Sequence, residues 1–274
     1  MEISVAHTPD ADDAFMFYGI ASGKIRPRMS VRHVIADIET LNQRAIDHKL
    51  DVTAISAHAF AYLKDYVILK SGGSFGLDYG PIVLAKKEIP VGELAKAKIA
   101  IPGRLTSAYL LLLLAIGKFD AHEMPFDRIP DAVASGKVDA GLVIHEAQIT
   151  YDSKKFSKVI DLGKWWTKTT EGLPVPLGVN VASLRSMSRQ AIEEFSSIFT
   201  GSITYGLDHM DDAVDYAMKY SRGQPKETIT KFVRMYVNDL TLDMGPQGKQ
   251  AIETMFEMAR ERGIISNKVI VDVV

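Results

Sequence analysis

Two hydroxyl side chains stand at the start of an apolar helical segment, directly after a Pro-Gly turn, in Pro102–Leu110. Thr106 and Ser107 occupy the position where the first backbone N–H groups of a helix have no acceptor of their own. Such N–H groups, at the positive end of the helix dipole, can bind a small anion without a cation. The alternative is a plain N-terminal cap that binds nothing. Ser56, after the predicted strand Val52–Ile55, offers the same geometry a second time.

His145 follows a short apolar strand predicted at Ala140–Ile144. Ligands of open α/β sheets bind outside the carboxyl ends of the strands, so this position favours a place in a cleft. An imidazole, with an unperturbed pKa of about 6.5, is suited to accept a proton near neutral pH. The alternative is a core or surface histidine that is satisfied by one hydrogen bond.

An acidic run, Pro9–Asp13, follows the first predicted strand. Asp12 or Asp13 is expected to cap the helix that is predicted from Ala14. No complementary acids and histidines stand at ligand spacing, so we predict no metal site.

Two further segments supply weaker candidates. The loop Ser71–Gly76 is rich in glycine but lacks a phosphate-binding lysine and a GxGxxG pattern. We therefore interpret Gly73 as a point where the backbone approaches a ligand or a hinge. The loop residues Trp165 and Trp166 either line a pocket or only pack a lobe.

Composition excludes several classes of function. The 274 residues carry 32 basic and 34 acidic side chains, a net charge of −2, which favours neither nucleic acid nor a membrane as partner. The absence of cysteine excludes disulfides, thiolate metal sites and cysteine nucleophiles. The longest apolar run, Leu110–Ile116, is far shorter than the ~20 residues of a membrane span. Because Met1–Ala6 forms a predicted strand without signal-peptide features, we expect a cytoplasmic protein.

Short apolar runs alternate with helical patterns, which predicts an α/β fold with largely parallel sheets. The predicted strands are Ile3–His7, Val31–Ala36, Val52–Ile55, Pro81–Ala85, Lys98–Ile101, Ala140–Ile144 and Leu177–Ala182. The predicted helices are Ala14–Ile20, Thr40–Lys49, Ala57–Leu63, Thr106–Ile116, Ile129–Ser135, Ser188–Leu207, Asp211–Tyr220, Lys226–Val237 and Gly245–Gly263.

An internal similarity indicates two lobes. Leu41–Ile55 and Ile129–Val143 both combine an amphipathic helix, a tight turn and a buried strand, and they share an aspartate at Asp51 and Asp139. We predict a first lobe of residues 1–87 and 175–274 and a second lobe of residues 88–174. The chain is expected to cross over after the strand Pro81–Ala85 and to return at Leu177–Ala182, which makes a double-crossing hinge that closes on a ligand.

The sequence also resembles a known family over nearly its whole length. The resemblance rests on Asp37–Asn42, Ser71–Gly73, Gly80-Pro81, Pro102–Tyr109, Gly141–Glu146, Asp161–Trp166 and Gly172–Gly178. These segments are similar to the 1,4-dihydroxy-6-naphthoate synthase family of the futalosine route to menaquinone. The resemblance implies a type II periplasmic-binding-protein-like fold and a lyase that converts cyclic de-hypoxanthine futalosine to 1,4-dihydroxy-6-naphthoate.

The resemblance also implies roles for single residues. His145 stands where the family has its proton-accepting histidine. The segments Ala54-Ile55-Ser56 and Thr106-Ser107 stand where the family binds its substrate, and a substrate carboxylate suits the helix starts described above. We expect no cofactor and one small carboxylate-bearing ligand; the sequence does not determine the oligomeric state, for which a homodimer is one option.

The first loop departs from the family. The usual Ser-Pro-Cys-Pro-Asn-Asp is here Thr8–Asp13, which keeps the final acid at Asp13 but places Asp10 and Asp12 at the Cys and Asn positions. Extra acid beside an anionic ligand is unfavourable unless it points away or is hydrogen-bonded.

Two other functions fit the same pattern. A chorismate dehydratase of the same pathway shares the fold, although the strand end His145-Glu146 favours the naphthoate synthase. A solute-binding protein for a small organic anion also shares the fold, and the lack of a signal peptide argues against it.

Overall fold

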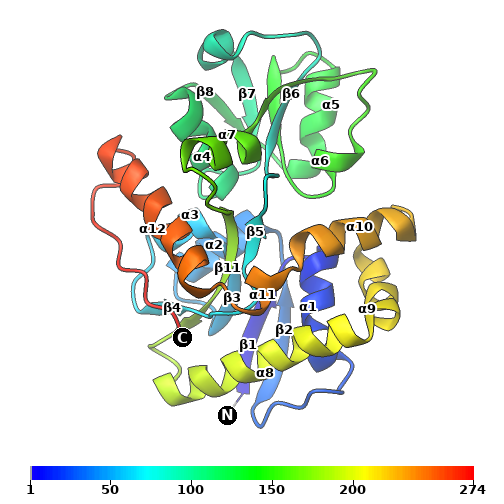
Figure 1. Ribbon diagram of the computed structural model, residues 1–274, viewed down its shortest axis with the longest axis vertical. Coiled ribbons are helices and arrows are strands. Elements are labelled where there is room, and N and C mark those ends of the chain that lie inside the picture. The colour runs from blue at the N-terminus through cyan, green and yellow to red at the C-terminus, as the bar shows by residue number, and fades with distance from the viewer. Residues whose placement is uncertain (1) are drawn as a thin grey trace.

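The chain forms two α/β lobes, one above the other in Figure 1. This computed structural model describes residues 2–274, so Met1, the first residue of the predicted first lobe, lies outside the described residues. Within residues 2–274 no helix has both the length and the apolar character to cross a membrane.

The elements follow one another in α/β order. The strands are β1 (Glu2–His7), β2 (Ser30–Ile35), β3 (Val52–Ser56), β4 (Tyr66–Ile68), β5 (Ser74–Gly76), β6 (Ile82–Ala85), β7 (Lys98–Ile101), β8 (Asp120–Glu123), β9 (Ala140–Val143), β10 (Ser157–Asp161) and β11 (Val175–Ser183). The α-helices are α1 (Ala11–Ala21), α2 (Ile38–Ile46), α3 (Ala57–Phe60), α4 (Ser107–Ile116), α5 (Ile129–Ala134), α6 (Ala147–Thr150), α7 (Leu162–Thr169), α8 (Arg189–Asp208), α9 (Met210–Ala217), α10 (Lys226–Tyr236), α11 (Asp239–Leu242) and α12 (Gly245–Glu261).

Each lobe contains one sheet, and the two sheets share a plan. The first has the order β2-β1-β3-β11-β4, with β5 also paired to β11, and the second has the order β10-β6-β9-β7-β8. In each, three strands are parallel, β2-β1-β3 and β8-β7-β9, and the next strand, β11 or β6, is antiparallel to them. The sheets are therefore mixed, whereas the sequence predicted largely parallel ones.

The internal similarity corresponds to real structural equivalence. Asp51, just before β3, accepts a hydrogen bond at 2.8 Å from the backbone N–H of Ser4 in β1. Asp139, just before β9, accepts one at 2.8 Å from the backbone N–H of Lys98 in β7. Each aspartate thus ties the last of the three parallel strands of its lobe to the first of them.

The position of the first crossing differs from the prediction. Strand β6 pairs with β9 and β10 in the second sheet, so the chain leaves the first lobe between β5 and β6 and not after Ala85. The return at β11 is as predicted, since β11 pairs with β3 and β4 of the first sheet. Helices α8, α9 and α10 then pack against α1 of the first lobe.

Two local predictions were wrong. Helix α1 begins at Ala11 and not at Ala14, so Asp10 is its N-cap residue and Asp12 and Asp13 lie in its first turn. Trp166 lies on helix α7 and not in a loop, and Asp161 caps that helix by accepting a hydrogen bond from the backbone N–H of Lys164.

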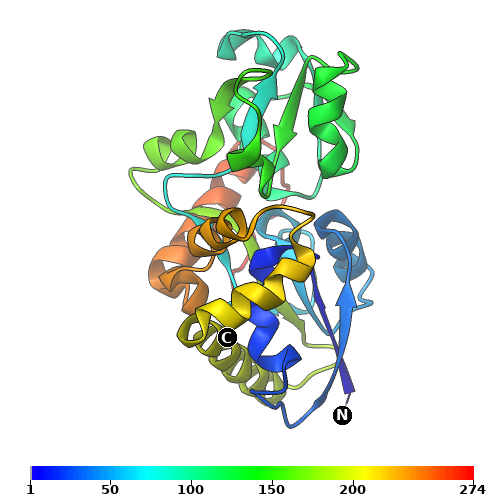
Figure 2. The same cartoon turned by 90° about the vertical axis from the view of Figure 1, so that its right-hand side faces the viewer.

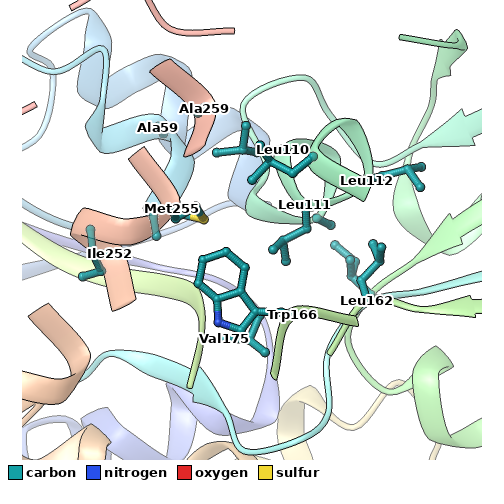
Figure 3. Packing of buried hydrophobic residues seen from close by; sticks show 14 of the residues in the cluster. Ala59, Leu110, Leu111, Leu112, Leu162, Trp166, Val175, Ile252, Met255 and Ala259 are labelled. Atoms are coloured by element: carbon teal, nitrogen blue, oxygen red, sulfur yellow. The ribbon is translucent and has the colours of Figure 1, made fainter. Parts of the chain in front are cut away.

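One apolar core runs through both lobes on one side of the molecule. Figure 3 shows Trp166 of α7 among Leu111 of α4, Val175 of β11 and Met255 of α12. All four side chains are fully buried. Since α12 belongs to the C-terminal helices and α4 to the second lobe, this packing fixes the two lobes together beside the chain crossings.

Candidate functional site

A cavity of about 100 Å³ lies between the lobes, at the carboxyl ends of the parallel strands. Its lining combines the start of α1, the end of β3, the start of α4, the segment after β9 and the middle of β11. The residues that line it include Thr8, Asp10, Asp12, Asp13, Ala54, Ile55, Ser56, Gly72, Thr106, Ser107, Ala108, His145, Gln148, Asn180 and Tyr236.

The start of α4 is an open anion site made of backbone. The Thr106 hydroxyl caps the helix, because it accepts from the Tyr109 N–H at 3.2 Å and donates to the Gly103 carbonyl at 2.8 Å. Within residues 2–274 no acceptor meets the N–H groups of Ser107 and Ala108. The positive end of a ten-residue helix therefore faces the cavity with two N–H donors that the described residues leave unpaired, as a carboxylate site requires.

The Ser107 hydroxyl serves the protein and not the cavity. It donates to the Leu177 carbonyl of β11 at 2.6 Å and accepts from the His58 N–H at 3.2 Å. Burial lowers the pKa of the His58 imidazole to about 4, so this group is neutral near pH 7. Both hydroxyls of the Thr106-Ser107 pair thus position the helix start and leave ligand binding to its N–H groups.

Ser56 lines the cavity with Ala54 and Ile55, but its geometry differs from that of α4. Its N–H donates to Asn42 Oδ1 at 2.9 Å, and its hydroxyl accepts from Asn42 Nδ2 at 3.2 Å. Helix α3, which follows, has only four residues. The Ser56 N–H is therefore already engaged, whereas the hydroxyl still has its own hydrogen to donate to a ligand in the cavity.

His145 enters the cavity from the second lobe. Its backbone has a φ of 54°, a left-handed conformation that turns the chain sharply away from β9. The Nδ1 atom lies 3.3 Å from Asp10 Oδ2, and the ring packs edge-on against Phe126. No partner for Nε2 exists in the described part of the chain, so this nitrogen is available to a ligand.

The three acids at the start of α1 are buried, with exposures of 2% for Asp10, 8% for Asp12 and 6% for Asp13. Asp13 Oδ2 accepts from both the N–H and the hydroxyl of Thr8, each at 2.7 Å. Burial raises the pKa of Asp12 well above its ordinary value, with repulsion from Asp13 and Asp10 adding to it. Burial likewise raises the pKa of Asp13. These two groups therefore bring less negative charge to the cavity than the sequence suggests.

Asp10 is the exception. Its burial opposes ionisation, but the neighbouring His145 and Arg222 outweigh burial and lower the pKa of the Asp10 carboxyl. Asp10 Oδ1 pairs with the Arg222 guanidinium, which also donates to the Pro9 carbonyl at 3.0 Å. The negative charge of Asp10, which departs from the family pattern in this loop, is thus balanced by Arg222, a residue more than two hundred positions further along the chain.

Polar contacts bridge the cleft opposite the apolar core. Arg222 of the first lobe donates to Glu146 Oε2 of the second lobe at 3.1 Å, and its guanidinium lies 4.8 Å from the centre of the Phe126 ring. We call Asp10, Arg222 and Glu146 the latch. Figure 2 shows the segment between α9 and α10, which carries Arg222, at the boundary between the lobes.

Further contacts show that the lobes are closed. The Leu105 N–H donates to Glu39 Oε2 at 3.2 Å across the cleft. The Gln148 amide lies 2.8 Å from the Tyr236 hydroxyl, again between the lobes. Sequence reasoning missed Arg222, Gln148 and Tyr236, because they lie on segments with no motif.

The remaining sequence candidates have different positions. Asp13 and Gly72 line the cavity, whereas Gly73 does not. Trp166 does not line it either; its ring is fully buried and Nε1 donates to the Pro174 carbonyl at 3.0 Å. Of the two interpretations of this tryptophan, the structure therefore favours packing.

Two buried oxygens on the cavity wall have no partner in the described residues 2–274, Asp12 Oδ1 and Asn180 Oδ1. The Asn180 amide nitrogen is satisfied, since it donates to the Gly72 carbonyl at 2.8 Å. Unpaired buried polar atoms are costly, so both oxygens are places where a bound ligand can supply a hydrogen bond. No group of three or more His, Asp or Glu side chains in residues 2–274 is arranged to hold a metal ion.

Together, two lobes with this strand order, a double crossing and a cavity between the strand ends define a periplasmic-binding-protein-like fold. Solved structures agree. The ligand-binding component of an ABC-type import system from Staphylococcus aureus superposes with a TM-score of 0.70 at 16% identity, covering 95% of this chain and 92% of that one. An alkanesulfonate-binding protein from Xanthomonas axonopodis gives 0.68 at 13% identity, covering 98% and 96%.

Closer relatives identify the family. The family described as "Menaquinone biosynthesis" matches residues 3–261, and this chain belongs to it. A Thermus thermophilus protein named 1,4-dihydroxy-6-naphthoate synthase is 37% identical over 263 residues, covering 96% of this chain and 95% of the relative. A Streptomyces coelicolor protein of the same name is 32% identical over 270 residues, covering 96% and 94%. A crystal structure from Archaeoglobus fulgidus is 49% identical with a TM-score of 0.92, covering 96% and 98%.

Proposed function

We propose that this chain is a 1,4-dihydroxy-6-naphthoate synthase, a lyase that forms the naphthoate from cyclic de-hypoxanthine futalosine in menaquinone biosynthesis. One observation carries the proposal: His145, with its Nε2 unpaired in residues 2–274, and the open start of α4 line the same closed cavity. The names of the two curated relatives support the same activity. As part of this proposal we place the enzyme in the cytoplasm.

The substrate carboxylate binds at the start of α4. The N–H groups of Ser107 and Ala108 donate to it, and the helix dipole adds electrostatic attraction. Because these donors belong to the backbone, they are fixed before the substrate arrives and need no reorganisation. The carboxylate end is thereby anchored on the second lobe.

His145 acts as the general base. Its Nε2 removes a proton from the ring system of the substrate that bears the carbocycle, and this starts cleavage of a carbon–carbon bond. Aromatisation to the naphthoate drives the reaction forward. The unpaired oxygens of Asp12 and Asn180 offer hydrogen bonds to the polar groups at the other end of the substrate.

Lobe closure completes the site. Asp10 and Glu39 come from the first lobe, whereas His145 and Leu105 come from the second, so these pairs form only when the lobes are together. Closure also removes water from around the base and the carboxylate, which strengthens both interactions.

Product analysis tests the proposal. The purified protein is incubated with cyclic de-hypoxanthine futalosine, and 1,4-dihydroxy-6-naphthoate is measured by chromatography with mass detection. Parallel incubation with chorismate tests for a dehydratase, and calorimetry with simple organic anions tests for a solute-binding protein. Turnover of chorismate, or tight anion binding with no turnover of either substrate, would overturn the proposal.

The variant His145→Ala tests the assigned base. We expect kcat to fall by about 10²–10⁴-fold, because the general base is lost, while the substrate dissociation constant changes little. His209→Ala is the control, since His209 is exposed at the end of α8 and away from the cavity. Full turnover by His145→Ala would remove the assignment.

A further inference from the structure

The N-cap aspartate of α1 does not cap its helix. Residues at this position usually accept a hydrogen bond from the N–H two or three residues later. The Asp10 side chain makes no such bond, although its backbone carbonyl accepts from the Ala14 N–H at 3.0 Å. The carboxylate points instead across the cleft, where Oδ2 lies 3.3 Å from His145 Nδ1.

The position of this carboxylate is fixed from its other side. Oδ1 pairs with the Arg222 guanidinium, and Arg222 is held in turn by the Pro9 carbonyl and Glu146 Oε2. The side chain of Asp10 is only 2% exposed, so water cannot compete for its oxygens. A buried, ionised carboxylate beside one nitrogen of a histidine favours the tautomer in which that nitrogen carries the proton.

We propose that Asp10 is a positioning residue for His145: it holds the proton on Nδ1, so that Nε2 faces the substrate as an unprotonated acceptor. The argument rests on the proposed function for the role of His145 as base. The present contact is long and tightens to a hydrogen bond when substrate fills the cavity, as catalytic hydrogen bonds commonly do. Asp10 also stabilises the imidazolium that forms when Nε2 takes up the proton.

Spectroscopy tests the tautomer without any reaction. In nitrogen-15 spectra of the full chain labelled at histidine, His145 is assigned by the signal that His145→Gln removes. Wild type is expected to show a protonated Nδ1 and an unprotonated Nε2, and Asp10→Asn is expected to shift the population toward a protonated Nε2. A wild-type Nε2–H tautomer, or an unchanged tautomer in Asp10→Asn, overturns the proposal.

Kinetics test the effect on catalysis through a double-mutant cycle. Asp10→Asn is expected to lower kcat by about 10–10³-fold with a smaller change in KM, because the base is present in the wrong tautomer. In the His145→Ala background the same substitution is expected to change kcat less than about twofold, since the effect of Asp10 on the chemical step passes through His145; a rise in KM from the weakened Asp10–Arg222 pair is expected in both backgrounds. Equal losses in both backgrounds would show a merely structural role and overturn the proposal.

The control and the two readouts separate the possible failures. Asp65→Asn removes a comparable aspartate–arginine pair, to Arg185 at 2.7 Å, from an exposed site in the same lobe, and should leave both the tautomer and kcat unchanged. If wild type turns over no futalosine derivative but shows the Nδ1–H tautomer that Asp10→Asn disturbs, the proposed function fails and the positioning role stands. If wild type is active but the tautomer test fails, the reverse holds.

Discussion

The substitution Arg222→Gln is the sharpest test of how the lobes stay closed. Arg222 is the only member of the latch that binds acids from both lobes, Asp10 in the first and Glu146 in the second. Glutamine keeps a polar side chain but removes the charge and shortens the reach. On the opposite side of the cleft, the apolar packing around Trp166 is unaffected, so the expected response is opening at the latch side and not unfolding.

The magnitude follows from the environment of the pair. A hydrogen bond to a charged group contributes about 1.5–3 kcal/mol, and the Arg222 side chain is 33% exposed, so we take about 2 kcal/mol of closure energy as lost. When the lobes open, water can reach the carboxylates of Glu146 and Asp10. The free-energy cost of the substitution is therefore smaller than that of leaving a charge buried without a partner. Since substrate is held tightly only by the closed form, KM should rise by up to about 30-fold.

Two measurements check this prediction. Small-angle X-ray scattering should give a larger radius of gyration for Arg222→Gln than for wild type without ligand, and steady-state kinetics should give the rise in KM. Arg185→Gln is the matched control, because Arg185 pairs with Asp65 inside the first lobe. If Arg222→Gln and Arg185→Gln gave the same scattering curve and the same KM as wild type, the latch would contribute nothing to closure and the reasoning would be refuted.

Two further predictions concern stability. Because the pKa of Asp12 is raised in the folded protein, Asp12 loses its proton at a lower pH in the unfolded chain than in the folded one. The contribution of neutral Asp12 to the free energy of unfolding is therefore complete below about pH 4 and is lost as the pH rises toward the pKa of the folded state. Asp12→Asn removes this loss, because asparagine does not ionise. In urea denaturation the free energy of unfolding of Asp12→Asn should exceed that of wild type by a margin that grows above about pH 4. Asp211→Asn, at the equivalent but exposed position of α9, is the control and should show no such margin. Trp166→Phe leaves the Pro174 carbonyl without its hydrogen-bond donor and should lower the free energy of unfolding by about 1–3 kcal/mol, measured by thermal or urea unfolding. Trp165→Phe is the control, because Trp165 is only half-buried, and it should lower the free energy of unfolding clearly less. Equal losses in the two variants would contradict the packing role of Trp166.

Much of the architecture was predictable because it is encoded locally. Strands such as β3 and β9 are short runs of buried apolar residues, and the repeated aspartates Asp51 and Asp139 mark the same turn in each lobe. His145 and the start of α4 could be found for the same reason, since each follows directly from a strand end. Nothing beyond the adjacent residues is needed to place them at the edge of a sheet.

Other features depend on contacts that the sequence does not display. Strand β8 has the polar sequence Asp-Ala-His-Glu and is held as an edge strand by its pairing with β7. Helix α7 was mistaken for a loop because its two tryptophans interrupt a polar stretch, although Asp161 stands at its start as a cap. Arg222 follows the last turn of a short helix in a loop near Gly223 and Pro225, and only the folded chain brings it to Asp10.

The starts of α1 and α4 occupy equivalent places in the two lobes, each after the first of the three parallel strands of its sheet, yet they are chemically opposite. Three carboxyl groups crowd the first, and uncharged backbone donors open the second. The two ends of the space between them therefore differ in polarity, and an elongated molecule with an acid at one terminus is favoured with that acid toward α4. A molecule bound in this direction places its acid at α4 and its other end beside the carboxyl groups of α1.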